Sequence, residues 1–138
     1  MSGHPDEAAG YTDGQRWAED LRTVIDACGL ERPVVVAWSY SGRMVNDYLR
    51  HVGPPALGGV VYVAAATLAV ASAVGPAHTW LAGMCSPEPE VERAALANFI
   101  GEVLRQPPGS PGHVHFERVA GRTSAQQRAW LRNRPLDY

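Results

Sequence analysis

The sequence contains no lysine, and its twelve positively charged residues are all arginines. With 14 acidic residues they leave a formal net charge of −2, and the arginines are scattered from Arg16 to Arg134. A nearly neutral chain without a concentrated basic surface is not expected to bind nucleic acid. Cysteines are also few, and Cys28 and Cys85 match neither a disulfide framework nor a metal-binding spacing. We therefore expect two free thiols in a cytoplasmic protein that holds no metal and no cofactor.

Charged residues are missing altogether between Arg50 and Glu88. Within that interval, the uncharged residues 56–75 form a stretch of about 20 residues, which is long enough to cross a bilayer. Most of these residues are small, and Gly58 and Gly59 interrupt them, so transfer of the stretch into lipid is only weakly favourable. We interpret it as a buried strand followed by a second segment, and we predict no membrane partner. The polar opening residues also argue against a secretory signal.

A helix is predicted after an opening loop over residues 1–11. Thr12 and Gln15 form a capping-box pattern at its start, and Gly29 is a typical C′ residue at its end. Apolar residues recur at helical spacing on one face. They are Trp17, Leu21, Val24, Ile25 and Cys28.

Two valine-rich runs, at residues 33–38 and 59–65, predict strands. Neither run alternates with polar residues, so we expect both strands to be buried on both faces of a parallel sheet. A helix over about 42–51 is predicted between them. The order helix, strand, helix, strand is typical of an α/β fold with right-handed crossovers.

The second half of the chain has a different pattern. Residues 67–84 are small and apolar without clear periodicity, and a helix is expected from about Ser86 to Gln106. Its expected buried stripe consists of Val91, Ala95, Phe99, Val103 and Leu104. A turn-rich linker follows at 107–112, and Ser124 with Gln127 predicts the cap of a last short helix.

The sharpest predicted turn joins the first strand directly to the helix after it. A reversal this tight needs small residues two positions before and two positions after its tip. Ser39 meets this condition, with Ala37 before it and with Ser41 and then Gly42 after it. A tip at Ser41 fails, because Arg43 stands two positions later.

The segment Ala37-Trp38-Ser39-Tyr40-Ser41 resembles the nucleophile elbow of the α/β-hydrolase family, G-x-S-x-G, with both glycines replaced. The resemblance extends over nearly the whole chain and is tightest over residues 11–66. It implies a partial α/β-hydrolase fold in which Ser39 is the catalytic nucleophile and the backbone N–H of Tyr40 is an oxyanion donor. Ala37, Ser41 and Gly42 are then the small residues that support the elbow.

The family also needs an acid and a histidine base, in that order after the serine. The resemblance places both in segments that would follow the end of this chain. Asp47 and His51 lie on the helix after the elbow, with His51 about 15 Å along it by the helical rise, and Asp47 is expected to be exposed. Of the other histidines, His78 has no acid near it in the sequence, and His4 lies in the opening loop. His113 and His115 are interpreted as members of a surface loop, with a metal pair as the alternative.

The 138 residues fit one ordinary domain by length, but the resemblance makes them the middle of a larger one. It predicts a partial core with the elbow over residues 1–66 and a mostly helical cap or lid over 67–138. Two strands cannot close a covered sheet, so we expect an isolated chain that is poorly stable or self-associates through unpaired strand edges.

The expected function is serine-dependent hydrolysis of an ester or related acyl bond in a small-molecule substrate, by a truncated chain that lacks the acid and the histidine. C–C bond hydrolysis, acyl transfer and perhydrolysis stay open, because the same elbow serves all of them. One alternative is a non-catalytic truncated remnant with at most an interaction role. Another is a small membrane-anchored protein.

Overall fold

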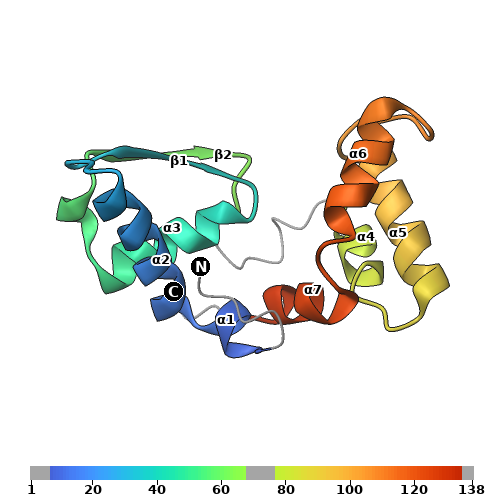
Figure 1. Cartoon of the computed structure of the whole chain (residues 1–138), viewed down its shortest axis with the longest axis horizontal. Coiled ribbons are helices and arrows are strands. Elements are labelled where there is room, and N and C mark those ends of the chain that lie inside the picture. The colour runs from blue at the N-terminus through green and yellow to red at the C-terminus, as the bar shows by residue number, and fades with distance from the viewer. Residues whose placement is uncertain (1–6, 68–76, 135–138) are drawn as a thin grey trace. The chain divides into compact units, whose positions relative to one another are not determined.

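A computed structural model describes residues 7–67 and 77–134, which belong to two compact units (Figure 1). We call residues 7–67 the sheet unit and residues 77–134 the helical unit. The predictions for His4 and for residues 68–75 of the uncharged stretch concern residues that lie outside the described ranges. Among the helices that are described, none is long and apolar enough to cross a membrane.

The sheet unit contains two parallel strands with helices on one side (Figure 1). Its elements are, in order, α1 (Ala9–Thr12), α2 (Gly14–Ala27), β1 (Val34–Trp38), α3 (Ser41–His51), a 3-10 helix (Pro54–Ala56) and β2 (Gly59–Val63). The register runs from Val34 opposite Gly59 to Trp38 opposite Val63. The predicted α/β class is confirmed, and both strands lie within the predicted runs, although β2 ends at Val63 rather than at residue 65.

The start of the first long helix differs from the prediction by one residue. Asp13 is the N-cap of α2, and its carboxylate accepts a hydrogen bond of 2.9 Å from the Gln15 amide. The predicted cap residue, Thr12, instead ends the single turn α1 and donates its hydroxyl to the Ala8 carbonyl. The expected opening loop was therefore wrong over its last residues. The predicted end is confirmed, because α2 closes at Ala27 and Gly29 adopts a φ of +63°.

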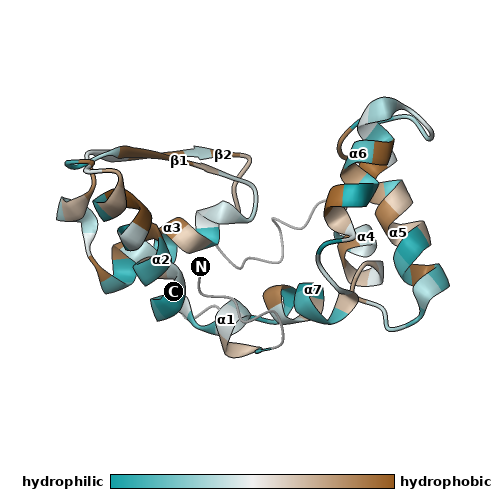
Figure 2. Ribbon diagram, in the orientation of Figure 1, coloured by the Kyte–Doolittle hydropathy of each residue, from teal (hydrophilic) through white to brown (hydrophobic). Residues whose placement is uncertain are grey.

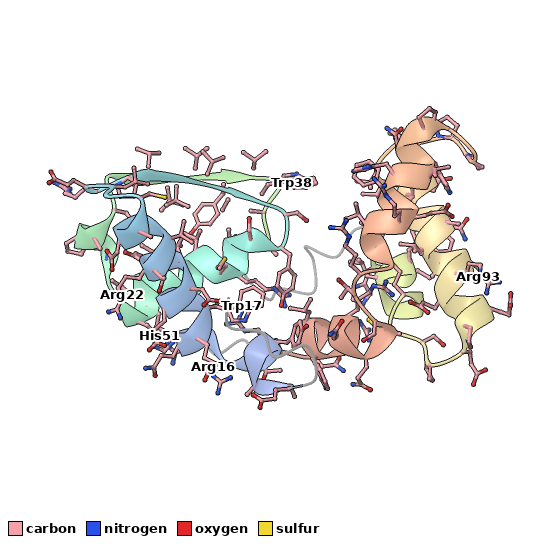
Figure 3. The ribbon with its side chains drawn as sticks, viewed as in Figure 1. Arg16, Trp17, Arg22, Trp38, His51 and Arg93 are labelled. Carbon is pink, nitrogen blue, oxygen red and sulfur yellow. The ribbon has the colours of Figure 1, made fainter. Side chains whose placement is uncertain are left out.

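The prediction that both faces of the sheet are buried was wrong for this structure. Side chains alternate along β1, so Ala37 is buried while Val36 and Trp38 are each more than 60% exposed. Val61 and Val63 of β2 are also exposed. Helices α2 and α3 cover only one side of the sheet, and side chains project from its other side into open space (Figure 3). Hydrophobic residues occupy much of both strands (Figure 2), including exposed positions such as Val36 and Val61. Apolar and polar residues therefore do not alternate in the strand sequences, although one face of the sheet is open.

The core of the sheet unit forms where α2 and α3 meet beneath the sheet. Ala18, Ile25, Tyr48 and Leu57 are buried together, and partly buried residues such as Leu21 pack against them. The α2 face was predicted only in part. Val24 and Cys28 are exposed, because the helix turns its Ala18–Ile25 side inward.

The helical unit consists of helices throughout its described residues, with no strand among them. They are α4 (His78–Gly83), α5 (Pro89–Glu102), α6 (Pro111–Ala120) and α7 (Ala125–Arg132). The predicted helix around 86–106 is confirmed in a shorter form as α5. Its stripe was partly wrong, because Val91 and Val103 are exposed while the unpredicted Ile100 is buried.

Helix α6 corrects the expectation of a surface loop around His113 and His115. Ser110 caps this helix by accepting a hydrogen bond from the His113 amide, and Pro111 occupies its first position. The proline-rich segment was therefore a helix start as well as a linker. The capping box of the last helix is confirmed, because the Ser124 and Gln127 side chains each accept from the other residue's amide.

Arg128 ties the helical unit together. Its guanidinium donates to the carbonyl oxygens of Met84, at the end of α4, and Ala120, at the end of α6, at 3.1 and 2.8 Å. It also forms an ion pair with Glu92 of α5. Only 11% of the Arg128 side chain is exposed. One arginine on α7 therefore holds the other three helices through charge-assisted hydrogen bonds.

Candidate active site

The tip of the predicted turn lies between the last residue of β1 and the first residue of α3. Only Ser39 and Tyr40 separate the two elements. Ser39 has a φ of +53°, in the left-handed region. A non-glycine residue adopts this conformation at a cost of roughly 1–2 kcal/mol. Such strain persists only where the surroundings enforce it, and it gathers at functional sites. Ser39 is exposed, so its hydroxyl is accessible to solvent.

Three backbone hydrogen bonds hold Ser39 in this conformation. Its amide donates to the Val63 carbonyl at the end of β2, at 3.1 Å. Its carbonyl accepts two bonds, one of 3.2 Å from the Gly42 amide in α3 and one of 2.9 Å from the Ala66 amide after β2. The bent residue is therefore bonded both to the neighbouring strand and to the helix that follows it.

Ser41, predicted only as a small supporting residue, also closes the turn by hydrogen bonding. Its Oγ lies 2.7 Å from the Trp38 amide, which donates to it, and 2.7 Å from the Trp38 carbonyl, to which it donates. The hydroxyl thus links the last residue of β1 to the first residue of α3. A glycine at this position, as in the family pattern, would lack these bonds.

Gly42 is the residue whose missing side chain permits the closest approach in this region. A Cβ atom there would lie 2.8 Å from the Ala66 carbonyl oxygen and 2.9 Å from the Ala65 Cβ. The first turn of α3 therefore presses against the segment that follows β2. Ala37, two residues before the tip, is 1% exposed and lies opposite Tyr62 in the sheet.

The Tyr40 ring is packed between two side chains. Its centroid lies 5.9 Å from that of Trp17, at a tilt of 60°, and the Arg43 guanidinium carbon lies 5.0 Å from it. Trp17 projects from α2 toward the elbow (Figure 3) and donates its indole N–H to the Gly10 carbonyl. Tyr40 is the N-cap residue of α3, so its amide belongs to the end of the helix where backbone N–H groups favour negative charge.

Asn46 and Tyr62 form a second polar contact near the elbow, and the sequence analysis missed both residues. Asn46 Nδ2 donates to the Thr67 carbonyl at 2.8 Å, and the Tyr62 hydroxyl donates to Asn46 Oδ1 at 2.7 Å. Burial raises the pKa of the Tyr62 phenol, so it stays protonated and able to donate at neutral pH. One signal was available, because Asn46 stands one helical turn after Gly42 and so lies on the same face of α3.

A general base is not bonded to Ser39 within the sheet unit. Within residues 7–67, the described part of the sheet unit, no hydrogen bond joins Ser39 Oγ to a histidine or a carboxylate. Asp47 is only 2% exposed, so the expectation that it faces solvent was wrong. It lies on the buried face of α3 beside Tyr48.

The remaining histidines occupy other places. His51 is exposed in the last turn of α3, where a positive charge complements the helix dipole. His78 begins α4 and is exposed. His113 is buried, with Nδ1 3.1 Å from the Gln106 carbonyl oxygen and Nε2 3.3 Å from a Glu117 carboxylate oxygen. In the ranges that the structure describes, no three His, Cys, Asp or Glu side chains gather to hold a metal ion.

The chain is similar to two crystal structures of esterases over almost its full length. One is described as a "putative aryl esterase" from Burkholderia cenocepacia, with 26% identity and a TM-score of 0.79 over 98% of this chain. The other is an esterase from Rhodococcus sp. ECU1013, with 30% identity and a TM-score of 0.80 over 94% of this chain. In both cases the chain spans 50% of the solved protein. No protein-family model matches the sequence, and no curated protein matches it.

These likenesses confirm the resemblance to the α/β-hydrolase family and the partial α/β-hydrolase fold. They extend through the sheet unit and the helical unit alike, because nearly all of the chain aligns. They make the chain esterase-like in fold.

Proposed function

We propose that this chain carries the nucleophilic part of an esterase, in which Ser39 attacks the carbonyl carbon of a small-molecule ester. The observation that carries the proposal is the left-handed backbone of Ser39 at an exposed turn between β1 and α3. Ser39 is exposed at that turn and is not one of the buried residues of the core. The similarity to two esterases supports the same class of reaction.

In the proposed reaction, Ser39 Oγ forms a bond to the carbonyl carbon, and a general base takes its proton. The carbonyl π electrons move to the oxygen, where the Tyr40 amide donates a hydrogen bond to the developing negative charge. Collapse of this intermediate breaks the bond to the alcohol oxygen, which takes the proton from the base. Water then attacks the acyl-serine, giving one proton to the base, and the acid leaves as Ser39 Oγ takes that proton back. The Tyr40 ring contacts Trp17 and Arg43, and these contacts help to hold the residue that bears this amide.

The proposal requires a base, which the sheet unit does not supply in contact with Ser39. We propose that another residue of this chain, outside the sheet unit, supplies it. We propose that residues 67–138 form a cap or lid segment. The support is that every described element after residue 67 is a helix, whereas the turn at Ser39 belongs to the sheet unit.

A fluorophosphonate probe tests the proposal, because it forms a covalent adduct with activated serines. We expect the folded chain to be labelled, and we expect peptide mapping to place the adduct on Ser39. The variant Ser39→Ala should lose labelling, whereas Ser124→Ala, which removes only a helix cap, should keep it. Circular dichroism confirms that each sample is folded.

The second candidate is a chain that keeps the fold without catalysis. The specific observation in its favour is that no histidine or carboxylate among residues 7–67, the described part of the sheet unit, is hydrogen-bonded to Ser39 Oγ. Absence of labelling in a folded sample would reject the esterase proposal and favour this candidate.

A further inference from the structure

We propose that Asn46 is a positioning residue for Ser39, acting through the segment that follows β2. The inference rests on the proposed role of Ser39 as a nucleophile, but it concerns how the Ser39 backbone is held. Asn46 does not contact the reacting atoms in this proposal. It clamps the backbone that in turn bonds to Ser39.

The first step of the argument is that both strands end in a strained residue. Ser39 follows β1 with a φ of +53°, and Ala64 follows β2 with a φ of +44°. The two residues come directly after Trp38 and Val63, which are partners in the sheet. Two non-glycine residues in the left-handed region therefore stand beside each other, and neither conformation is favourable by itself.

The second step is that Ser39 depends on the segment after β2. The Val63 carbonyl accepts a hydrogen bond from the Ser39 amide, and the Ala66 amide donates one to the Ser39 carbonyl. Residues 64–67 form neither helix nor strand, so no regular ladder fixes the position of the Ala66 amide. Something else must hold this segment against α3.

The third step is that the Asn46 side chain bonds to a residue of β2 just before that segment and to the last residue of the segment. Its Oδ1 accepts from the Tyr62 hydroxyl, before Ala64, and its Nδ2 donates to the Thr67 carbonyl, after Ala66. Gly42 lies one helical turn earlier, where the absence of a Cβ lets residues 65 and 66 lie close to α3. Along α3, Gly42 thus leaves room for the segment after β2, and Asn46 then bonds to the same segment.

The chemistry of the clamp favours an amide side chain at this position. Asparagine can accept at its oxygen and donate at its nitrogen at the same time, whereas an ionised aspartate only accepts. The Tyr62 phenol is protonated at neutral pH and supplies the donor. Asn46→Asp therefore keeps the bond to Tyr62 and loses the bond to Thr67, while Tyr62→Phe does the reverse.

The experiment compares Asn46→Ala with Asn46→Asp, Tyr62→Phe and a matched control, Leu49→Ala. Leu49 lies on the same helix and packs on the core, so its truncation lowers stability without touching the clamp. Amide hydrogen exchange of Ser39 and Ala66 is measured by NMR in the full chain, relative to the exchange of the α3 core amides. The rate constant and the half-saturation concentration of fluorophosphonate labelling are measured on the same samples.

We expect Asn46→Ala to speed exchange of the Ser39 and Ala66 amides about tenfold more than that of the α3 core. We expect the maximal labelling rate constant to fall at least about tenfold with little change in half-saturation, because a misplaced nucleophile reacts slowly. In Asn46→Asp and Tyr62→Phe, the exchange rates and the labelling rate constant should lie between those of Asn46→Ala and those of the wild type. Leu49→Ala should move all amides together and leave the maximal rate constant within about twofold.

The inference would be overturned if exchange of the Ser39 and Ala66 amides, relative to that of the α3 core amides, were equal in Asn46→Ala and Leu49→Ala. This holds whatever the labelling result. A purely structural role would lower the fraction of chain that labels and leave the maximal rate constant unchanged, which would also overturn it. A wild-type chain that does not label rejects the proposed function of Ser39. The exchange measurement then still decides whether Asn46 holds its backbone.

Discussion

The sheet unit and the helical unit are held together by different kinds of interaction. In the sheet unit, α2, α3 and the loop before β2 bury an apolar cluster, and backbone hydrogen bonds shape the turn at Ser39. In the described part of the helical unit, only Ala95 and Ile100 are buried apolar residues. Its four helices are linked by the guanidinium of Arg128, and the ring of His113 bonds α6 to Gln106 in the loop after α5.

The difference shows what each unit needs in order to be specified. A helix that packs by its apolar face is visible as a sequence period, and a turn is visible as a run of small residues. A charged side chain that donates hydrogen bonds to carbonyl groups of other helices produces no periodic pattern in the sequence. It is also costly to remove, because its partners remain behind in a poorly solvated place.

The largest predicted effect tests the polar tie of the helical unit. Arg128→Met should lower the free energy of unfolding by roughly 3 kcal/mol, because a nearly buried charge and its hydrogen bonds to two carbonyls and Glu92 are lost together. Urea denaturation measures the loss. Arg132→Met, on the exposed side of the same helix, is the control and should change stability by no more than about 0.5 kcal/mol. Similar losses in both variants would show that Arg128 is not a central tie.

The next effect concerns strain in the sheet unit. Ser39→Gly should be more stable than Ser39→Ala by roughly 1 kcal/mol, because glycine adopts a positive φ without the penalty that alanine pays. Both variants lack the hydroxyl, so neither should be labelled. Thermal or urea unfolding gives the difference between them.

A matched substitution sharpens this prediction. Arg105 of the helical unit also has a φ of +53°, and Arg105→Gly should gain stability to a similar degree. Labelling should be unaffected there, because Arg105 has no proposed chemical role. If Ser39→Gly were no more stable than Ser39→Ala, the turn would not be strained as described.

A smaller effect is expected at the open face of the sheet. The double change Val36→Thr and Val61→Thr should alter the free energy of unfolding by no more than about 0.5 kcal/mol, because both side chains are exposed. We propose that this face and the unpaired strand edges promote self-association. Sedimentation should then shift toward the monomer in the double variant.

The control for that prediction is Val45→Thr, at a position only 2% exposed. It should lower stability by roughly 1–3 kcal/mol, because it places a hydroxyl in the apolar core. If the wild type were already a monomer at all concentrations, the proposed self-association would be rejected.

The smallest predicted effect compares the two thiols. Burial raises the pKa of Cys85, and Arg132 and Arg128 oppose that shift only in part. Cys85 should therefore react with iodoacetamide at pH 8 more slowly than Cys28, which is exposed. Mass spectrometry of each alkylated peptide over time gives the two rates, and a faster Cys85 would contradict the shift.

The raised pKa of Cys85 also predicts the direction in which stability changes with pH. Because the thiol pKa is higher in the folded chain than in the unfolded chain, deprotonation favours unfolding. Stability should therefore fall slightly as the pH rises above the ordinary thiol range. Cys85→Ser should remove that part of the pH dependence.

Local patterns could be read well from the sequence where one interaction type dominates. The run of valines indicated β1, the small residues indicated the turn at Ser39, and the Ser124–Gln127 capping box was correct to the residue. Each depends on neighbours within a few positions. The errors arose where neighbours competed, as when Asp13 rather than Thr12 capped α2. Burial was misjudged for Asp47, because its surroundings come from elements far away in the sequence.

By itself, then, the sequence determined the α/β order, the position of the turn and the small residues that permit it, because backbone geometry and side-chain size act locally. Only the tertiary structure decided that one face of the sheet is open, since that depends on which helices lie beside it. It also decided that Asn46 reaches across to Tyr62 and Thr67, and that Arg128 joins four helices. Apart from the bond between Arg128 and Ala120, those contacts link residues that are 16 to 44 positions apart, over which no sequence period extends.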